Sequence, residues 1–161
     1  MTVGEYNRCV EDCADGLYRF LLRNIRDEEK ASDIVQDSFE KLWRKADYVE
    51  YKKAKSYLFT TAYHTMIDSI RKEKRIEDFS IVKQEHHAHN EQYTDLQEIL
   101  HEALERLTEI QRSVILLRDY EGYSYGEIGE ITGLNESQVK VYIYRARVLL
   151  KNYIGSMQAV I

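Results

Sequence analysis

The side chains best suited to chemistry lie between residues 124 and 151, where basic residues recur at helical spacing. Lys140 and Arg147 are seven residues apart, so on an α-helix they project from one face, and Val141 adjoins Lys140. Lysine and arginine side chains can bind phosphates and guanine edges, and a valine can contact a thymine methyl group. This pattern indicates nucleic-acid recognition. The opposite side of the helix is apolar and should pack inward: Val139, Tyr142, Ile143, Ala146, Leu149 and Leu150.

Two capping patterns place this basic helix second in a helix-turn-helix. Ser124 and Glu127 have the spacing at which two side chains satisfy the free amides of a helix start, and Asn135 and Gln138 repeat it. Gly133, between the two pairs, suits the left-handed conformation that ends a helix. A helix-turn-helix can place its second helix in the major groove of DNA. The alternative interpretation is a solvated basic helix in an ordinary small bundle.

A second basic region covers residues 41–75, which hold ten basic and four acidic side chains in a chain of net charge −5. The helix expected over residues 52–74 carries His64 and Arg71 on the side opposite its apolar face, and Ile67 is expected there too. Basic residues interleaved with tyrosines suit contact with the backbone and bases of unpaired strands. For some of these tyrosines the alternative is partial burial in the domain. The apolar face is expected to consist of Leu58, Ala62, Thr65, Met66 and Ser69.

The composition predicts an all-α protein and excludes several classes. The 161 residues include no proline and 32% are charged, and no alternating strand pattern exceeds a few residues. No apolar run approaches the roughly 20 residues that span a membrane, and no secretory signal is expected. Nucleotide-binding glycine loops and nucleophile motifs are absent from the sequence, so we expect no enzyme and no cofactor. Cys9 and Cys13 should be reduced thiols in a core, with a metal site the less favoured alternative.

The periodicity divides the chain into two small helical domains joined by a flexible linker. Three helices form a predicted N-terminal domain of residues 1–76, with caps at Thr2 and Asp27. Residues 77–93 are polar and break the periodicity, and they are interpreted as the linker. Residues 94–161 are predicted to form a four-helix domain that ends in the helix-turn-helix. The first helix of this domain, opened by Thr94 and Gln97, carries Leu96, Ile99, Leu100, Ala103 and Leu104. The linker contains three histidines for which a metal role is much less favoured than a polar connection: His86, His87 and His89.

With both halves in view, the chain resembles the extracytoplasmic-function group of bacterial sigma factors, small two-domain subunits that direct RNA polymerase to promoters. Residues 33–43, DIVQDSFEKLW, resemble the helix with which that family binds core polymerase. Residues 57–71, YLFTTAYHTMIDSIR, resemble the helix that reads and melts the −10 element. Residues 107–112, 122–129 and 139–147 match the family's −35-binding domain.

The chain departs from the family pattern at four positions. Tyr57 stands where tryptophan is usual and His64 where asparagine is usual, and both could alter how the −10 element is read. Thr108 replaces a common proline, and Gly129 replaces an alanine. The last two replacements are expected to be structurally mild.

The resemblance implies three binding surfaces and no catalytic residue. Core polymerase would be bound by Asp33, Gln36, Asp37, Glu40 and Trp43. The −10 element would be bound by Tyr57, Thr60, Tyr63, His64, Asp68, Arg71, Lys72, Lys74 and Arg75. The −35 element would be bound by Ser124, Ser137, Gln138, Lys140, Val141, Tyr144, Arg145 and Arg147.

The function implied by the resemblance is promoter-specific initiation of transcription by −35 and −10 recognition. Its partners would be core RNA polymerase, promoter DNA and an anti-sigma factor, in the cytoplasm and without membrane insertion. The main alternative is a stand-alone helix-turn-helix transcriptional regulator, whose C-terminal domain would look much the same. Such a regulator should add a ligand pocket or a phosphoacceptor in its first domain, and the sequence offers neither. A helical interaction protein without a DNA role is a further alternative.

Overall fold

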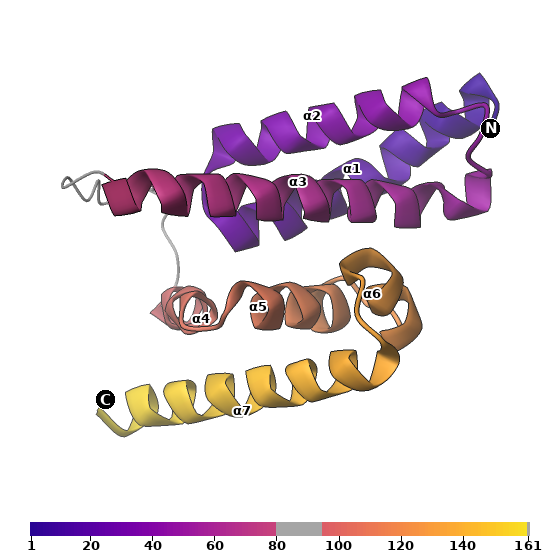
Figure 1. Cartoon of the computed structure of the whole chain (residues 1–161). Coiled ribbons are helices and arrows are strands. Elements are labelled where there is room, and N and C mark those ends of the chain that lie inside the picture. The colour runs from indigo at the N-terminus through magenta and orange to yellow at the C-terminus, as the bar shows by residue number, and fades with distance from the viewer. Residues whose placement is uncertain (80–94, 161) are drawn as a thin grey trace. The chain divides into compact units, whose positions relative to one another are not determined.

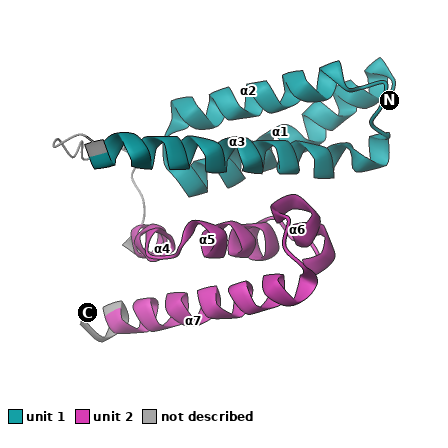
Figure 2. Cartoon of the chain, in the orientation of Figure 1, with its two compact units in different colours: residues 1–88 teal, residues 89–161 magenta. Residues whose placement is uncertain are grey.

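The computed structural model describes residues 1–79 and 95–160 of the chain. The chain divides into two compact units, residues 1–88 and 89–161 (Figure 2). Every regular element among the described residues is helical (Figure 1), which confirms the predicted all-α class. No described helix combines the length and the apolar character needed to cross a membrane.

The described residues of unit 1 form three helices that pack pairwise: α1 (Val3–Ile25), α2 (Glu28–Arg44) and α3 (Tyr51–Phe79). The predicted caps are present. Thr2 Oγ1 accepts from Glu5 N at 3.1 Å, and Asp27 Oδ1 accepts from Lys30 N at 3.1 Å. Between α1 and α2 the chain turns through Arg26, whose φ of 52° is left-handed. This tight turn sends α2 back along α1.

The core of unit 1 lies where the three helices meet. Phe20 of α1 and Phe59 of α3 are fully buried, and their ring centroids lie 5.8 Å apart. Ser38 is also buried on α2, where its hydroxyl donates to the Ile34 carbonyl at 2.7 Å. The remaining fully buried large side chains are Leu17, Leu21, Leu42, Leu58 and Met66.

The buried sector of α3 is wider than the sequence pattern indicates. Ile67 and Tyr63 are each only 7% exposed, so the expectation that Ile67 faces away from the apolar side is wrong. The reason is that α3 packs against both α1 and α2, so more of its surface is covered than one apolar stripe. Leu58, Ala62 and Met66 are buried as predicted.

The described residues of unit 2 form four helices, as predicted, and the last two make the helix-turn-helix. They are α4 (Asp95–Glu105), α5 (Glu109–Ile115) with its π-helical continuation η1 (Leu116–Tyr120), α6 (Tyr125–Thr132) and α7 (Glu136–Val160). Reciprocal capping boxes open α5 at Thr108 and α6 at Ser124, and Asn135 caps α7 in the same way. Gly133 ends α6 with a φ of 79°, which a side chain would strain.

The turn of this helix-turn-helix is closer packed than the sequence suggests. A Cβ atom on Gly129 would lie 2.7 Å from the Leu134 carbonyl oxygen, which is nearer than such atoms approach. The expectation that the replacement of alanine by glycine here is structurally mild is therefore wrong. Gly129 allows the chain after α6 to pass directly against that helix.

Leu149 and Leu96 are exposed apolar residues of unit 2, and for Leu149 the sequence predicts inward packing. Leu149 is 46% exposed and Leu96 is 66% exposed. On α7 the buried stripe is narrow and follows Val139, Ile143 and Ala146, so Leu149 falls on its flank. Beyond that stripe α7 is held to α4 by a hydrogen bond of 3.0 Å from Tyr153 to Glu102.

The domain boundaries and the linker remain predictions. Helix α3 continues to Phe79, so the boundary placed after residue 76 falls within a helix. Thr94 and the linker histidines His86, His87 and His89 lie outside the described residues.

The two cysteines are free and buried, as expected, with their sulfur atoms 3.9 Å apart. The contact with Cys13 and burial raise the pKa of the Cys9 thiol. No group of three potential metal ligands occurs in the described part of the chain.

Candidate polymerase and nucleic-acid interfaces

A groove of about 700 Å³ runs between α1 and α2 of unit 1. Trp43, at one end of α2, is 51% exposed, and the Tyr6 ring meets it edge-on with centroids 4.9 Å apart. The Tyr6 hydroxyl donates to the Phe39 carbonyl at 3.0 Å, and burial raises the pKa of Tyr6. The walls are mainly apolar and aromatic, with Gln36 and Glu40 as polar members. The lining consists of Tyr6, Val10, Ala14, Tyr18, Ser32, Val35, Gln36, Phe39, Glu40 and Trp43.

The structure separates the five residues predicted to bind polymerase into two sets. Gln36, Glu40 and Trp43 line the groove, whereas Asp33 and Asp37 do not. Asp33 is exposed, and Asp37 pairs with Lys41 at 2.9 Å. Glu40 pairs with Arg44 at 2.5 Å.

Sequence reasoning missed the contribution of α1 to this groove. Tyr6 and Val10 share the apolar periodicity of α1, which predicts that they pack inward, but both are only half-buried and line the groove. A helical apolar pattern does not distinguish side chains that enter the core from side chains that border a groove. By helical phase Tyr6 falls within the stripe of Cys9, Cys13 and Leu17 and Val10 falls just beside it, so periodicity alone could not have separated them.

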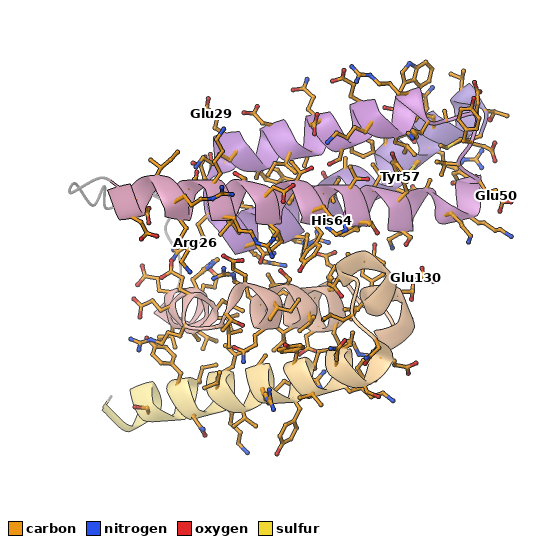
Figure 3. All side chains as sticks on the ribbon, viewed as in Figure 1. Arg26, Glu29, Glu50, Tyr57, His64 and Glu130 are labelled. Atoms are coloured by element: carbon orange, nitrogen blue, oxygen red, sulfur yellow. The ribbon has the colours of Figure 1, made fainter. Side chains whose placement is uncertain are left out.

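The outer side of α3 carries most of the predicted −10 residues. His64, Asp68, Arg71, Lys72, Lys74 and Arg75 are exposed or lie at the surface, and Tyr57 and Thr60 are half-buried. Figure 3 shows Tyr57 and His64 on this helix. Tyr63 is buried, and its ring meets the His64 ring edge-on at 5.5 Å, so it supports the histidine from beneath. Within the described residues, the four basic side chains at the end of this surface make no ion pair.

The predicted −35 residues divide into capping groups and exposed groups. Ser124 Oγ accepts from Glu127 N at 3.2 Å, and Gln138 Oε1 accepts from Asn135 N at 3.0 Å, so both side chains hold helix starts. Tyr144 is 70% exposed and Val141 is 45% exposed on the outer side of α7. Ser137, Lys140 and Arg145 are also exposed there.

Arg147, predicted to contact DNA, is engaged within unit 2. Its Nη2 and Nε donate to the two carboxylate oxygens of Asp119 at 2.6 and 3.1 Å, and these bonds raise the pKa of the guanidinium. Lys140 lies 3.5 Å from Glu136 and 5.5 Å from the centroid of the Tyr125 ring. Both basic residues are therefore positioned by neighbours before any ligand binds.

Comparison with known proteins places the chain in one class, the sigma factors. Residues 9–76 match sigma-70 region 2, and residues 97–150 match sigma-70 region 4. RNA polymerase sigma factor SigV of Bacillus subtilis (strain 168) is 32% identical over 146 residues, covering 89% of this chain and 87% of that protein. The extracytoplasmic-function sigma factor SigM of the same organism is 28% identical over 157 residues, covering 94% of each chain.

A solved structure agrees with the sequence relatives. The sigma factor RpoE from Bartonella quintana, crystallised with the anti-sigma factor NepR, superposes with a TM-score of 0.81 at 28% identity, covering 95% of this chain and 98% of that one. The chain belongs to the extracytoplasmic-function sigma factors of the sigma-70 family. It is a non-enzymatic factor for promoter-directed transcription initiation. A stand-alone regulator is not favoured, because unit 1 matches region 2 rather than a sensor domain.

Proposed function

We propose that the two units of this sigma factor divide its tasks among three surfaces. The groove between α1 and α2 binds core RNA polymerase, the outer side of α3 captures the unpaired −10 strand, and α7 reads the −35 duplex. The observation that carries the proposal is that Gln36, Glu40 and Trp43, from the polymerase-binding motif, border one groove.

The groove has the properties of a docking site for a protein helix. Binding energy at protein interfaces is concentrated in a few aromatic anchors set in apolar surroundings, with polar residues at the rim. Trp43 and Tyr6 supply paired aromatic rings, and Val35 and Phe39 supply apolar wall. Gln36 and Glu40 supply rim groups that can hydrogen-bond to a partner. We propose that Asp33 and Asp37 contribute charge beside this contact.

The outer side of α3 combines features that suit a single strand. His64 offers a ring for stacking, with Thr60 and Tyr57 before it. One turn beyond Asp68 begins the cluster of Arg71, Lys72, Lys74 and Arg75, which suits contact with phosphates. Because Tyr63 is buried, we assign it the support of His64 rather than direct stacking on a base.

On α7 the proposed reading surface is formed by Ser137, Lys140, Val141, Tyr144 and Arg145. It combines donors for base edges with apolar groups for thymine methyl contacts, which is the usual chemistry of major-groove readout. We further propose that the protein acts in the cytoplasm and that an anti-sigma factor controls it. The support for this partner is the Bartonella relative, which was solved with its anti-sigma factor.

Run-off transcription with core RNA polymerase tests the proposal. The templates are a library of promoter fragments randomised at the −35 and −10 positions, and binding is measured in parallel by gel shift with and without core enzyme. We expect transcription from a selected subset of templates, and shifts that depend on core enzyme. Sequence-specific binding that is unaffected by core enzyme, without transcription, would instead support a stand-alone regulator.

A matched pair of variants tests the polymerase surface. Gln36→Ala alters the groove lining, whereas Glu29→Ala alters an exposed residue of α2 outside the lining and outside the predicted polymerase set. We expect the first to weaken core binding more than the second, with helicity by circular dichroism unchanged in both. Equal affinities for core polymerase would refute the groove as the docking site.

A further inference from the structure

A cluster of charged residues connects α7, the second helix of the helix-turn-helix, to the π-helical turn η1. Arg147 of α7 donates two hydrogen bonds of 2.6 and 3.1 Å to Asp119 of η1, although the two residues are 28 positions apart in sequence. Two parallel bonds between a guanidinium and a carboxylate fix direction as well as distance. The side chains are 48% and 37% exposed, so this pair sits at the surface of unit 2 rather than in its core.

The π-helical turn presents two successive side chains to the two helices of the motif. Arg118 precedes Asp119 in η1, and its Nη1 donates to the Tyr123 carbonyl at 2.9 Å while its guanidinium lies 4.4 Å from the Tyr125 ring centroid. Arg118 therefore holds the start of α6, and Asp119 holds α7. A π-helical turn inside a helix is uncommon, and such turns concentrate at functional positions.

The same Tyr125 ring connects this cluster to the reading surface. Lys140 lies 5.5 Å from its centroid, on the side of α7 that also carries Arg147. The ring thus has Arg118 from η1 and Lys140 from α7 as cationic neighbours. Any rotation of α7 would break the bidentate Arg147 contact and move Lys140 away from the ring.

We propose that Arg147 is a positioning residue, which fixes the orientation of α7 through Asp119 and so sets −35 specificity, rather than a phosphate contact. This inference rests on the proposed −35 function of α7. The Nε and Nη2 donors of Arg147 that could bind a phosphate are already bonded to the Asp119 carboxylate. That carboxylate would also repel a phosphate placed beside it.

The salt dependence of DNA binding separates positioning from phosphate contact. Removal of one phosphate contact lowers the slope of log affinity against log salt by about 0.9 for duplex DNA. The probe is holoenzyme assembled with core RNA polymerase, on the −35 sequence selected by wild type from a randomised library. We expect Arg147→Gln to bind this sequence about tenfold more weakly, a decrease typical of coupled residues in contact, with an unchanged salt slope.

Asp119→Asn tests the same ion pair by changing the partner of Arg147, and the two hypotheses predict opposite effects. Positioning predicts weaker binding and a relaxed −35 preference, because α7 loses its anchor. Phosphate contact predicts equal or tighter binding, because Arg147 is released and a negative charge is removed. Glu130→Gln is the control for the change in charge. Glu130 is exposed on α6 (Figure 3), and its replacement removes one negative charge without breaking an ion pair among the described residues.

A charge-reversed double variant, Asp119→Arg with Arg147→Asp, keeps the pair but exchanges its ends. Recovery of the −35 preference relative to either single variant would support positioning, and circular dichroism melts check that each variant folds. A slope lowered by about one unit in Arg147→Gln, or a double variant no better than the single variants, overturns the inference. If wild-type holoenzyme itself shows no −35 preference, both this inference and the proposed function of α7 fail.

Discussion

The two units prepare their binding surfaces in opposite ways. In unit 1, Trp43 stands half out of its groove, and the basic cluster of Arg71, Lys72, Lys74 and Arg75 has no ion pair among the described residues. In unit 2, Lys140 and Arg147 are held by Glu136 and Asp119. Unpaired charge on a helix surface favours attraction to any phosphate backbone, whereas charge held in local pairs favours a fixed geometry.

This contrast fits the different forms of DNA that we assign to the two units, an unpaired strand to unit 1 and a duplex to unit 2. An unpaired strand is flexible, so a surface that captures it needs aromatic rings and mobile charges more than rigid placement. A base edge in a duplex groove demands donors in fixed positions. This contrast leads us to propose that basic residues of similar sequence appearance serve attraction in one unit and orientation in the other.

The largest expected effect comes from removing the basic cluster of α3 in unit 1. We expect replacement of Arg71, Lys72, Lys74 and Arg75 by glutamine to weaken promoter binding by holoenzyme on the order of 10²- to 10³-fold, with a clearly flatter salt dependence. Titration of holoenzyme on promoter DNA at several salt concentrations measures both quantities. Affinity for core polymerase should not change, and this provides the control. A salt slope like that of wild type would contradict phosphate contact by this cluster, and with it the proposed difference between the two units.

Truncation of the exposed tryptophan tests the second open surface. Trp43→Ala removes an aromatic anchor and the edge-on contact with Tyr6, so core polymerase affinity should fall by about 2 kcal/mol or more, roughly 30-fold. Tyr48→Ala is the matched control, because Tyr48 is 87% exposed on the same unit and lies outside the groove lining. Competition binding against a labelled wild-type chain measures the difference. Similar decreases in both variants would remove the groove from the polymerase interface.

His64 allows a finer test of strand capture on α3. If its ring stacks on an unpaired −10 base, His64→Ala should cost about 1–3 kcal/mol in open-complex formation and much less in closed binding. His64→Phe keeps an aromatic face and should retain most of the effect. Permanganate reactivity of −10 thymines reports strand opening. Equal reactivity in wild type and His64→Ala would contradict the stacking role.

Local features of this fold were predictable because their physics is local. The caps at Thr2, Ser124 and Asn135 each depend on residues three apart, and all three form as expected. The groove and the orientation of α7 were not predictable in this way. Tyr6 meets Trp43 across two helices, and Arg147 meets Asp119 across 28 residues, so both contacts depend on tertiary packing. The sequence marks Arg147 as basic and outward, but nothing local reveals that a carboxylate already occupies it.

The smallest expected effect separates capping from DNA contact at Ser124. Its hydroxyl accepts from Glu127 N, so Ser124→Ala should lower the free energy of unfolding by about 1 kcal/mol, as cap removal usually does. Thr108→Ala removes an equivalent cap on α5, and it should cost about the same while leaving −35 preference intact.

Ser124→Asp then distinguishes the two roles. Aspartate caps a helix as well as serine does, so stability should be retained, whereas a carboxylate at a phosphate contact would repel the DNA backbone. We expect near wild-type unfolding in urea and DNA affinity within a few-fold of wild type. A stable Ser124→Asp protein that no longer binds the −35 duplex would make Ser124 a direct phosphate contact. Ser124 would then belong with the residues of unit 2 that contact DNA rather than with those that only position its helices.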